Sequence, residues 1–238
     1  IIGVRESANV NAALVVVKIV ALALFVALAL PAFDLANFEP FSPYGFPATT
    51  DAEGADRGVM SAAAIIFFAF YGFDAVSTAA EETKDPGRNL SVGIIGSMLV
   101  CTLIYMAVAA AAVGALPFKE FSASREPLAH ILRSLGHGGA ASAIAAAAVI
   151  ALPTVILAFM YGQSRIFFVM ARDGLLPRRL GAVDKKSGTP VAMTILTGVV
   201  CSALAGVLPL ATIAELANAG TLCAFVATAV ALIILRVR

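Results

Sequence analysis

The sequence is poor in charged residues, and this scarcity excludes most soluble proteins. Charged residues make up 13% of the 238-residue chain, against about 25% in an ordinary soluble domain, whereas apolar residues make up 61%. The apolar residues fall in blocks of roughly 20, long enough for a helix to cross about 30 Å of hydrocarbon. We therefore expect an all-α, polytopic membrane protein with the lipid bilayer as its surroundings, rather than a soluble domain with several core helices.

The chain also has few residues suited to metal binding or catalysis, and it contains no tryptophan. Cys101, Cys201 and Cys223 each stand alone inside an apolar block, which excludes a disulfide framework and favours free thiols. His130 and His137 have no convincing ligand set around them. The motifs HExxH, GxSxG, GxxxxGKS/T and GxGxxG are absent. We expect no enzyme activity, no catalytic residue, no metal and no cofactor.

Six apolar blocks predict six membrane-spanning helices. In chain order they occupy residues 10–32, 58–80, 92–116, 139–170, 190–208 and 213–235. The fourth is longer than a bilayer requires and contains Pro153, which should kink it. Thr189 and Pro190 form a suitable start for the fifth, as a cap followed by proline in the first turn.

The basic residues predict the orientation of the helices. One set of connecting segments holds most of them: Arg5, Lys84, Arg88, Arg165, Arg172, Arg178, Arg179, Lys185, Lys186, Arg236 and Arg238. The opposite set holds Arg57, Lys119, Arg125 and Arg133. By the positive-inside rule, both ends of the chain face the cytoplasm, and the protein lies in a plasma or bacterial inner membrane. The basic residues then act as interfacial anchors, so no nucleic-acid partner is expected. Residues 33–57, acidic and rich in turns, should cap the outer face.

The most informative segment is Phe67–Ser77, in the middle of the second predicted helix. It contains Gly72 and an acid, Asp74. An acid at membrane depth usually marks function, and glycine weakens a helix locally. A helix break here would free backbone groups, which are tolerated only where they line a cavity or are buried in protein. The alternative is an unbroken helix in which Gly72 serves packing and Asp74 bonds to a neighbour.

Two further charged features have open interpretations. Lys18 lies about 12 Å into the first predicted helix, counting from residue 10. Burial disfavours the charged form of an amine, so Lys18 could load and release a proton; alternatively, its stem extends back to the interface. Residues 81–89, EETKDPGRN, form either a solvated turn with ion pairs or part of a gate.

Residues 67–89, FFAFYGFDAVSTAAEETKDPGRN, resemble the sixth-helix signature of the cationic amino-acid transporter branch of the amino acid–polyamine–organocation superfamily. Further matches follow in order over essentially the whole chain. Arg5-Glu6-Ser7 with Lys18 resembles the fifth helix, residues 162–177 resemble the end of the eighth, Thr189-Pro190 the start of the ninth, and Gly220-Thr221-Leu222 part of the tenth.

This resemblance implies a LeuT-like fold of two inverted five-helix repeats, with the second helix of this chain broken. On that mapping the chain begins, without an initial Met, at the last helix of the first repeat and lacks the first four helices of the same polypeptide. Those helices would carry the glycine loop that binds the substrate carboxylate.

The resemblance also implies roles for individual residues. Backbone carbonyls near Phe68, Ala69 and Tyr71 would receive the substrate ammonium, and aromatic rings in residues 68–73 would form part of a lid. Asp74 would belong to the pocket or its gate, Leu157 would face the substrate side chain, and Lys18 would replace a coupling cation. The predicted substrate-binding residues are Phe68, Ala69, Phe70, Tyr71, Gly72, Asp74 and Leu157, and the predicted proton-coupling residue is Lys18.

The leading hypothesis is a secondary active transporter that moves amino acids by alternating access, with protons as the coupling ion. One alternative is an amino-acid or polyamine exchanger of the same fold. Another, of a different class, is a membrane sensor or scaffold that transports nothing, and a continuous second helix would favour it.

Overall fold

The computed structural model describes residues 4–50, 56–77, 83–177, 182 and 191–237. Four long helices dominate them: α1 (Val4–Ala29), α3 (Pro86–Ala115), α6 (Gly138–Arg172) and α8 (Leu210–Val237). Shorter helices are α2 (Val59–Phe67), α4 (Phe118–Phe121), α5 (Pro127–Ser134) and α7 (Val191–Val207). The 3₁₀ turns include η1 (Leu30–Ala32), η2 (Leu35–Phe38) and η3 (Phe68–Phe70), and residues 75–77 form another. In the described ranges the only sheet is the two-residue pair β1 (Thr49–Thr50) and β2 (Asp56–Arg57).

Five helical segments are long and apolar enough to cross a membrane, judged by length and composition. They are Val10–Ala32, Val59–Ser77, Pro86–Ala115, Gly138–Arg172 and Thr212–Arg236. Together with the scarcity of strand, they confirm the prediction of an all-α polytopic membrane protein. The fifth expected span corresponds to α7, which has 17 residues and is therefore about 25 Å long. Its expected first residue, Pro190, lies outside the described residues.

Prolines set several helix boundaries. Pro31 has no N–H to continue the α-helical ladder, and α1 gives way to η1 there. Pro86 occupies the first turn of α3, where an N–H would be unpaired in any case, so this helix begins six residues before the predicted span. Pro153 lies inside α6 without ending it.

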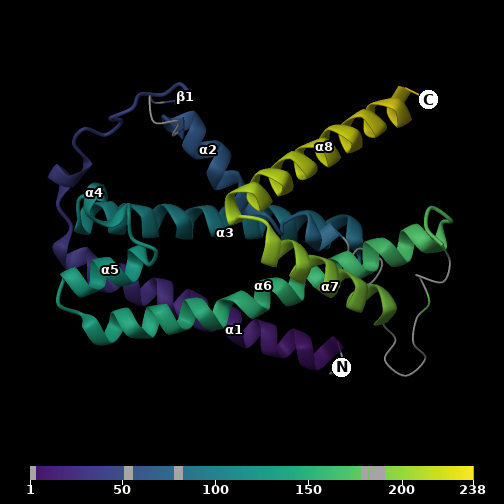
Figure 1. The fold of residues 1–238 in the computed structure, drawn as a ribbon, viewed down its shortest axis with the longest axis horizontal. Helices are drawn as coiled ribbons and strands as arrows, with labels where there is room; N and C mark the ends of the chain where they lie inside the picture. Colours follow the sequence, from purple (N-terminus) through teal and green to yellow (C-terminus); the bar gives the residue numbers. More distant parts are fainter. Residues whose placement is uncertain (1–3, 51–55, 78–82, 178–181, 183–190, 238) are drawn as a thin grey trace.

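The arrangement brings α1, α3 and α6 side by side, with α7 packed on α6 and the start of α8 near η3 (Figure 1). The most buried side chains collect where α1 and α3 end, α6 begins and the short helix α5 lies across them. They include Phe25, Ala29, Ala111, Ala112, Ile131, Leu132 and Ala141. Elsewhere the long helices expose large aliphatic side chains, as lipid-facing helices do.

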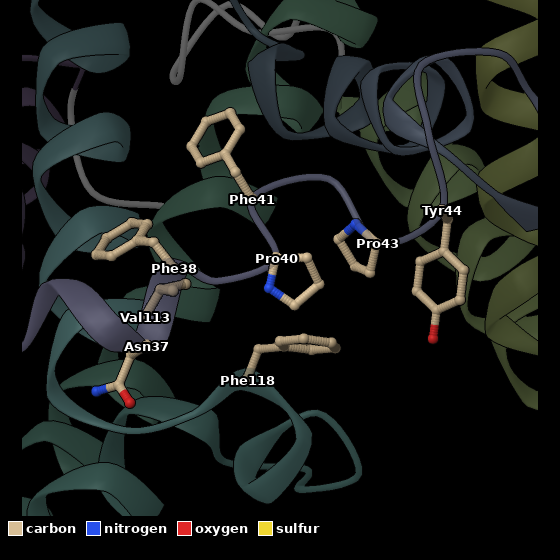
Figure 2. Close-up of a pocket in the computed structure, with 8 residues that line it drawn as sticks. All are labelled: Asn37, Phe38, Pro40, Phe41, Pro43, Tyr44, Val113 and Phe118. Atoms are coloured by element: carbon tan, nitrogen blue, oxygen red, sulfur yellow. The ribbon is translucent and has the colours of Figure 1, made fainter.

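The segment between α1 and α2 packs against the end of α3. The Asp34 N–H and the Asn37 side-chain amide both donate to the carbonyl of Gly114, at 2.8 and 2.7 Å. Figure 2 shows Pro40, Pro43 and Phe118 gathered around an open hollow of about 340 Å³ between this segment and α4. Residues 51–55 of the predicted cap lie outside the described residues.

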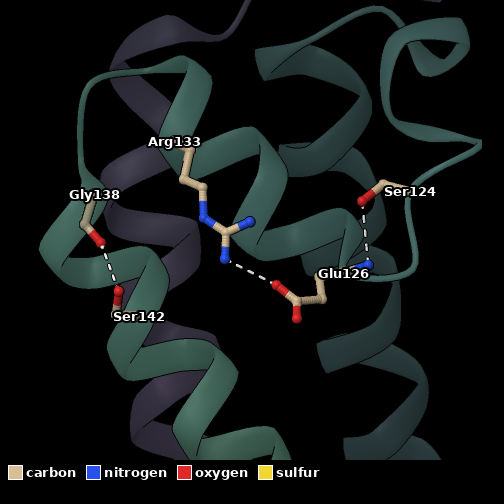
Figure 3. A network of polar contacts seen from close by, with 5 residues as sticks. All are labelled: Ser124, Glu126, Arg133, Gly138 and Ser142. Atoms are coloured by element: carbon tan, nitrogen blue, oxygen red, sulfur yellow. Dashed lines mark hydrogen bonds and ion pairs between the residues drawn. The ribbon is translucent and has the colours of Figure 1, made fainter.

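The connection from α4 to α6 is held by local polar contacts (Figure 3). Arg133 of α5 forms an ion pair with Glu126 at 2.9 Å, and both side chains are about half exposed. The Glu126 N–H donates to Ser124 Oγ at 3.1 Å, and Ser142 Oγ donates to the Gly138 carbonyl in the first turn of α6. Exposed ion pairs of this kind contribute little to stability, so these contacts serve mainly to fix the path of the loop.

Candidate substrate and coupling site

The second predicted span is not a continuous helix. The α-helix ends at Phe67, one 3₁₀ turn follows, and Tyr71 is extended with ψ 138°. Gly72 then has φ +116°, a conformation that glycine adopts without strain. The chain therefore leaves the helical path at Tyr71 and Gly72, which agrees with the broken-helix interpretation of this segment and not with the unbroken one.

Asp74 stabilises this break locally. Its carboxylate accepts a hydrogen bond from the Gly72 N–H at 3.2 Å, and its carbonyl accepts from the Ser77 N–H at 3.0 Å. A short acid next to a turn can pair freed backbone donors in this way. Both bonds are contacts that Asp74 makes at the break. The candidate gate at residues 81–89 is described only in part, because Glu81 and Glu82 lie outside the described residues. Within Thr83–Asn89, the Asn89 side-chain amide donates to the Lys84 carbonyl.

Side chains of α3 and α8 hold the broken segment. The Tyr105 hydroxyl donates to the carbonyl of Ala69 at 3.0 Å, and the Tyr71 hydroxyl donates to Asn218 Oδ1 at 2.7 Å. The Phe67 and Phe73 rings lie 6.5 and 5.7 Å from the ring of Phe225. Of the predicted lid aromatics, Tyr71 and Phe73 contact α8, and Phe70 contacts Tyr105 of α3. The Phe68 ring lies 5.2 Å from that of Tyr71, within the break itself.

Lys18 bonds across to another helix. Its amine donates to the hydroxyl of Thr154 on α6, and that hydroxyl donates to the carbonyl of Ala151 at 2.6 Å. Thr154 is 2% exposed and directly follows Pro153. The Lys18 amine is therefore directed between α1 and α6, whereas the snorkelling alternative would take it back to the interface.

Leu157 lies one turn beyond Thr154 on α6 and is 48% exposed. The hydrogen bonds between helices at the predicted site residues form two groups. One joins Lys18 to α6, on the helix that carries Leu157, and the other joins the break to α3 and α8. Among the residues that the structure describes, no three His, Cys, Asp or Glu side chains are grouped closely enough to hold a metal ion.

Sequence reasoning missed three polar partners: Thr154, Tyr105 and Asn218. Each stands within an apolar block, where a polar side chain needs a partner, and this was the available signal. The signal does not identify the partner, because that depends on how each helix is rotated against its neighbours.

Comparison with known proteins adds the family. A family model described as amino acid permease matches residues 1–238. The chain belongs to this amino acid permease family. The matched permeases and transporters are not enzymes, in agreement with the absence of catalytic motifs. They also agree with the resemblance drawn from residues 67–89 to the amino acid–polyamine–organocation superfamily.

Individual relatives show how far the similarity extends. The chain is 44% identical to the branched-chain amino acid permease BcaP of Bacillus subtilis, over 99% of this chain and 48% of the relative. It is 39% identical to the methylthioribose transporter of the same organism, over 98% and 48%. It is 33% identical to the vacuolar cationic amino acid transporter 4 of Arabidopsis thaliana, over 98% and 38%. The chain thus spans about half the length, or less, of the curated relatives it matches.

Proposed function

We propose that the permease containing this chain carries amino acids across a cell membrane by alternating access. The observation that carries this proposal is the break at residues 68–72, which leaves a backbone carbonyl, that of Ala69, without helical pairing at mid-span. Irregular backbone at membrane depth is characteristic of transporter substrate sites. The break also supports transport over a sensor or scaffold, for which an unbroken span would suffice.

The chemistry of the break suits an ammonium group. Carbonyl oxygens near Phe68, Ala69 and Tyr71 are acceptors, and an ammonium supplies three donors. The contact is strengthened where neighbouring aromatic rings exclude water, because charge-assisted hydrogen bonds are stronger in a medium of low dielectric constant. Phe68, Phe70 and Tyr71 provide such rings. A carboxylate-binding counterpart would come from other helices of the same polypeptide.

Proton coupling is proposed to act through Lys18 and Thr154. A protonated Lys18 has three donors and no acceptor, so it must donate to Thr154 Oγ1. A neutral amine has a lone pair, and Thr154 can donate to it only by giving up its bond to the Ala151 carbonyl. A neutral amine also keeps two N–H donors, so loss of the proton weakens the charge-assisted bond between α1 and α6 beside Pro153 and permits its reversal without requiring it.

We propose amino acids with branched aliphatic side chains as the substrate class. The relative with 44% identity bears the name of a branched-chain amino acid permease. Leu157, the predicted side-chain contact, is aliphatic and lies one turn from the proposed coupling residue Thr154. An uptake panel of leucine, arginine and methylthioribose tests this proposal. Saturable uptake of arginine or methylthioribose without leucine would contradict it.

The test of transport and coupling uses the whole permease in proteoliposomes. Leucine should accumulate when the outside is made acidic, and a protonophore should abolish accumulation. Lys18→Ala should lose this pH-driven accumulation, with Lys119→Ala, an exposed residue in α4, as the matched control. Accumulation by Lys18→Ala equal to wild type would overturn the coupling. Counterflow that proceeds without any gradient, and no net uptake with one, would identify an exchanger.

Both ends of the chain are proposed to face the cytoplasm, on the distribution of basic residues. An introduced cysteine at Ser122, between α4 and α5, should react with an impermeant maleimide added to intact cells. One at Gly87, in the first turn of α3, should react only after the membrane is opened. The reverse labelling pattern would contradict the orientation.

A further inference from the structure

Tyr105 pairs the carbonyl that the proposed function assigns to the substrate. Its hydroxyl, on α3, donates to the carbonyl oxygen of Ala69 at 3.0 Å, across 36 residues of sequence. Ala69 lies at the middle of the predicted span 58–80, and Tyr105 lies near the middle of 92–116. The contact therefore lies at mid-membrane, where water is scarce and an unpaired carbonyl is costly.

The Ala69 carbonyl is open to this bond because of the local backbone. A continued 3₁₀ helix would pair it with the Gly72 N–H, three residues on. The Gly72 N–H instead donates to the Asp74 carboxylate, and with a φ of +116° at Gly72 residues 71–74 form a turn before the 3₁₀ residues 75–77. Asp74 and Gly72 thus expose the acceptor, and Tyr105 satisfies it.

Tyr105 is only partly enclosed. The residue is 39% exposed, and its ring contacts the ring of Phe70 edge-on, with centroids 5.2 Å apart and planes at 67°. Rotation of the side chain is enough to withdraw the hydroxyl. A phenolic O–H and an ammonium N–H are both donors, so they compete for the same oxygen.

We infer that the Tyr105 hydroxyl occupies the substrate-ammonium position while the transporter is empty, and that the arriving ammonium displaces it. This inference rests on the proposed function. Tyr105 then has two effects. It lowers the affinity for amines, because binding breaks a hydrogen bond. It also pairs the Ala69 carbonyl while the site is empty. The empty transporter must reorient across the membrane to complete its cycle, and an unpaired carbonyl would make that step costly.

The decisive variant is Tyr105→Phe in the purified whole permease. Loss of the hydroxyl destabilises only the empty state, so the Kd for leucine should fall about two- to ten-fold, the factor expected for one neutral hydrogen bond. The Kd for 4-methylpentanoate, which is leucine without its ammonium group, should not change. Tyr105→Leu, which also lacks the hydroxyl, should show the same gain for leucine. Tyr44→Phe, in the loop before α2, is the matched control and should bind both ligands as wild type does.

Transport and stability measurements give independent readouts. Tyr105→Phe should slow net uptake while leaving leucine–leucine exchange near the wild-type rate, because exchange does not require the empty carrier to reorient across the membrane. Its melting temperature without ligand should lie below that of wild type, and saturating leucine should remove the difference.

Two outcomes would overturn the role of Tyr105. One is an unchanged or higher Kd for leucine, and the other is an equal change in Kd for leucine and 4-methylpentanoate, which indicates a purely structural effect. Wild-type permease that binds no amino acid of the uptake panel would refute the proposed function itself, and this inference with it.

Discussion

Lys18 on α1 and Thr154 on α6 are joined by a hydrogen bond from the lysine amine to the threonine hydroxyl. The bond lies directly after Pro153, where the ladder of α6 lacks one donor. The Thr154 hydroxyl in turn donates to the Ala151 carbonyl, so the Lys18 side chain on α1 is linked through Thr154 to the backbone of α6.

Replacing Thr154 with Val removes the acceptor and keeps the shape of the side chain. We expect Thr154→Val to lower the free energy of unfolding by about 1–3 kcal/mol, because a buried donor loses its partner. The pH dependence of leucine uptake should flatten at the same time. Thr154→Ser keeps the hydroxyl and should retain the wild-type pH profile. A flattened profile in Thr154→Ser, or a wild-type profile in Thr154→Val, would contradict the proposed role of the hydroxyl.

Replacing Gly72 with Ala tests the break. No atom lies within 4 Å of the position that a Cβ would occupy, so the cost comes from the backbone φ of +116°. We expect a loss of about 1–3 kcal/mol in stability and a sharp loss of uptake. The control is Gly93→Ala, at an uncrowded helical position of α3, which should be neutral or slightly stabilising. Equal melting temperatures and uptake for both variants would show that the break does not need glycine.

The pair Tyr71 and Asn218 tests whether α8 holds the broken segment. Their hydrogen bond of 2.7 Å should contribute about 0.5–1.5 kcal/mol, measured as the coupling in a double-mutant cycle of Tyr71→Phe and Asn218→Leu. Thermal or denaturant unfolding in detergent gives the stabilities. Additive effects of the two substitutions would show that the hydroxyl and the amide act independently.

Gly114 is expected to tolerate no side chain. A Cβ there would lie 2.2 Å from Cδ2 of Phe33, whose ring packs over the end of α3. Gly114→Ala should therefore displace the ring and destabilise the protein by about 1–3 kcal/mol, seen as a lower melting temperature. Phe33→Ala in the same chain should relieve the clash, so the double variant should be less destabilised than the two single effects summed.

Much of the helical content was predictable because it rests on composition. Long apolar blocks predict membrane helices whatever their neighbours are, and Gly72 with Asp74 marked the break because both act on their own backbone. The start of α3 at Pro86 was missed because the apolar run begins later than the helix. Helix formation depends on backbone pairing and capping, not on hydropathy.

The partners of the site residues were not predictable in the same way. Thr154, Tyr105 and Asn218 are 136, 36 and 147 residues from the groups they bind. Helices with apolar side chains all around carry little periodicity to show which face meets which neighbour. Only the packing of the helices determines that the Ala69 carbonyl bonds to a side chain of α3 and the Tyr71 hydroxyl to a side chain of α8.

The uneven distribution of buried side chains has a mechanical consequence. The buried residues around Phe25, Ile131 and Leu132 fasten α1, α3 and α6 together at one end, and α6 extends about 52 Å from there. The far half of α6 is held separately, because Thr154, Ser164 and Ala171 are also buried and α7 packs on this helix. A rotation of about 10° at the first end would displace the last residues of α6 by about 9 Å and would have to break those contacts.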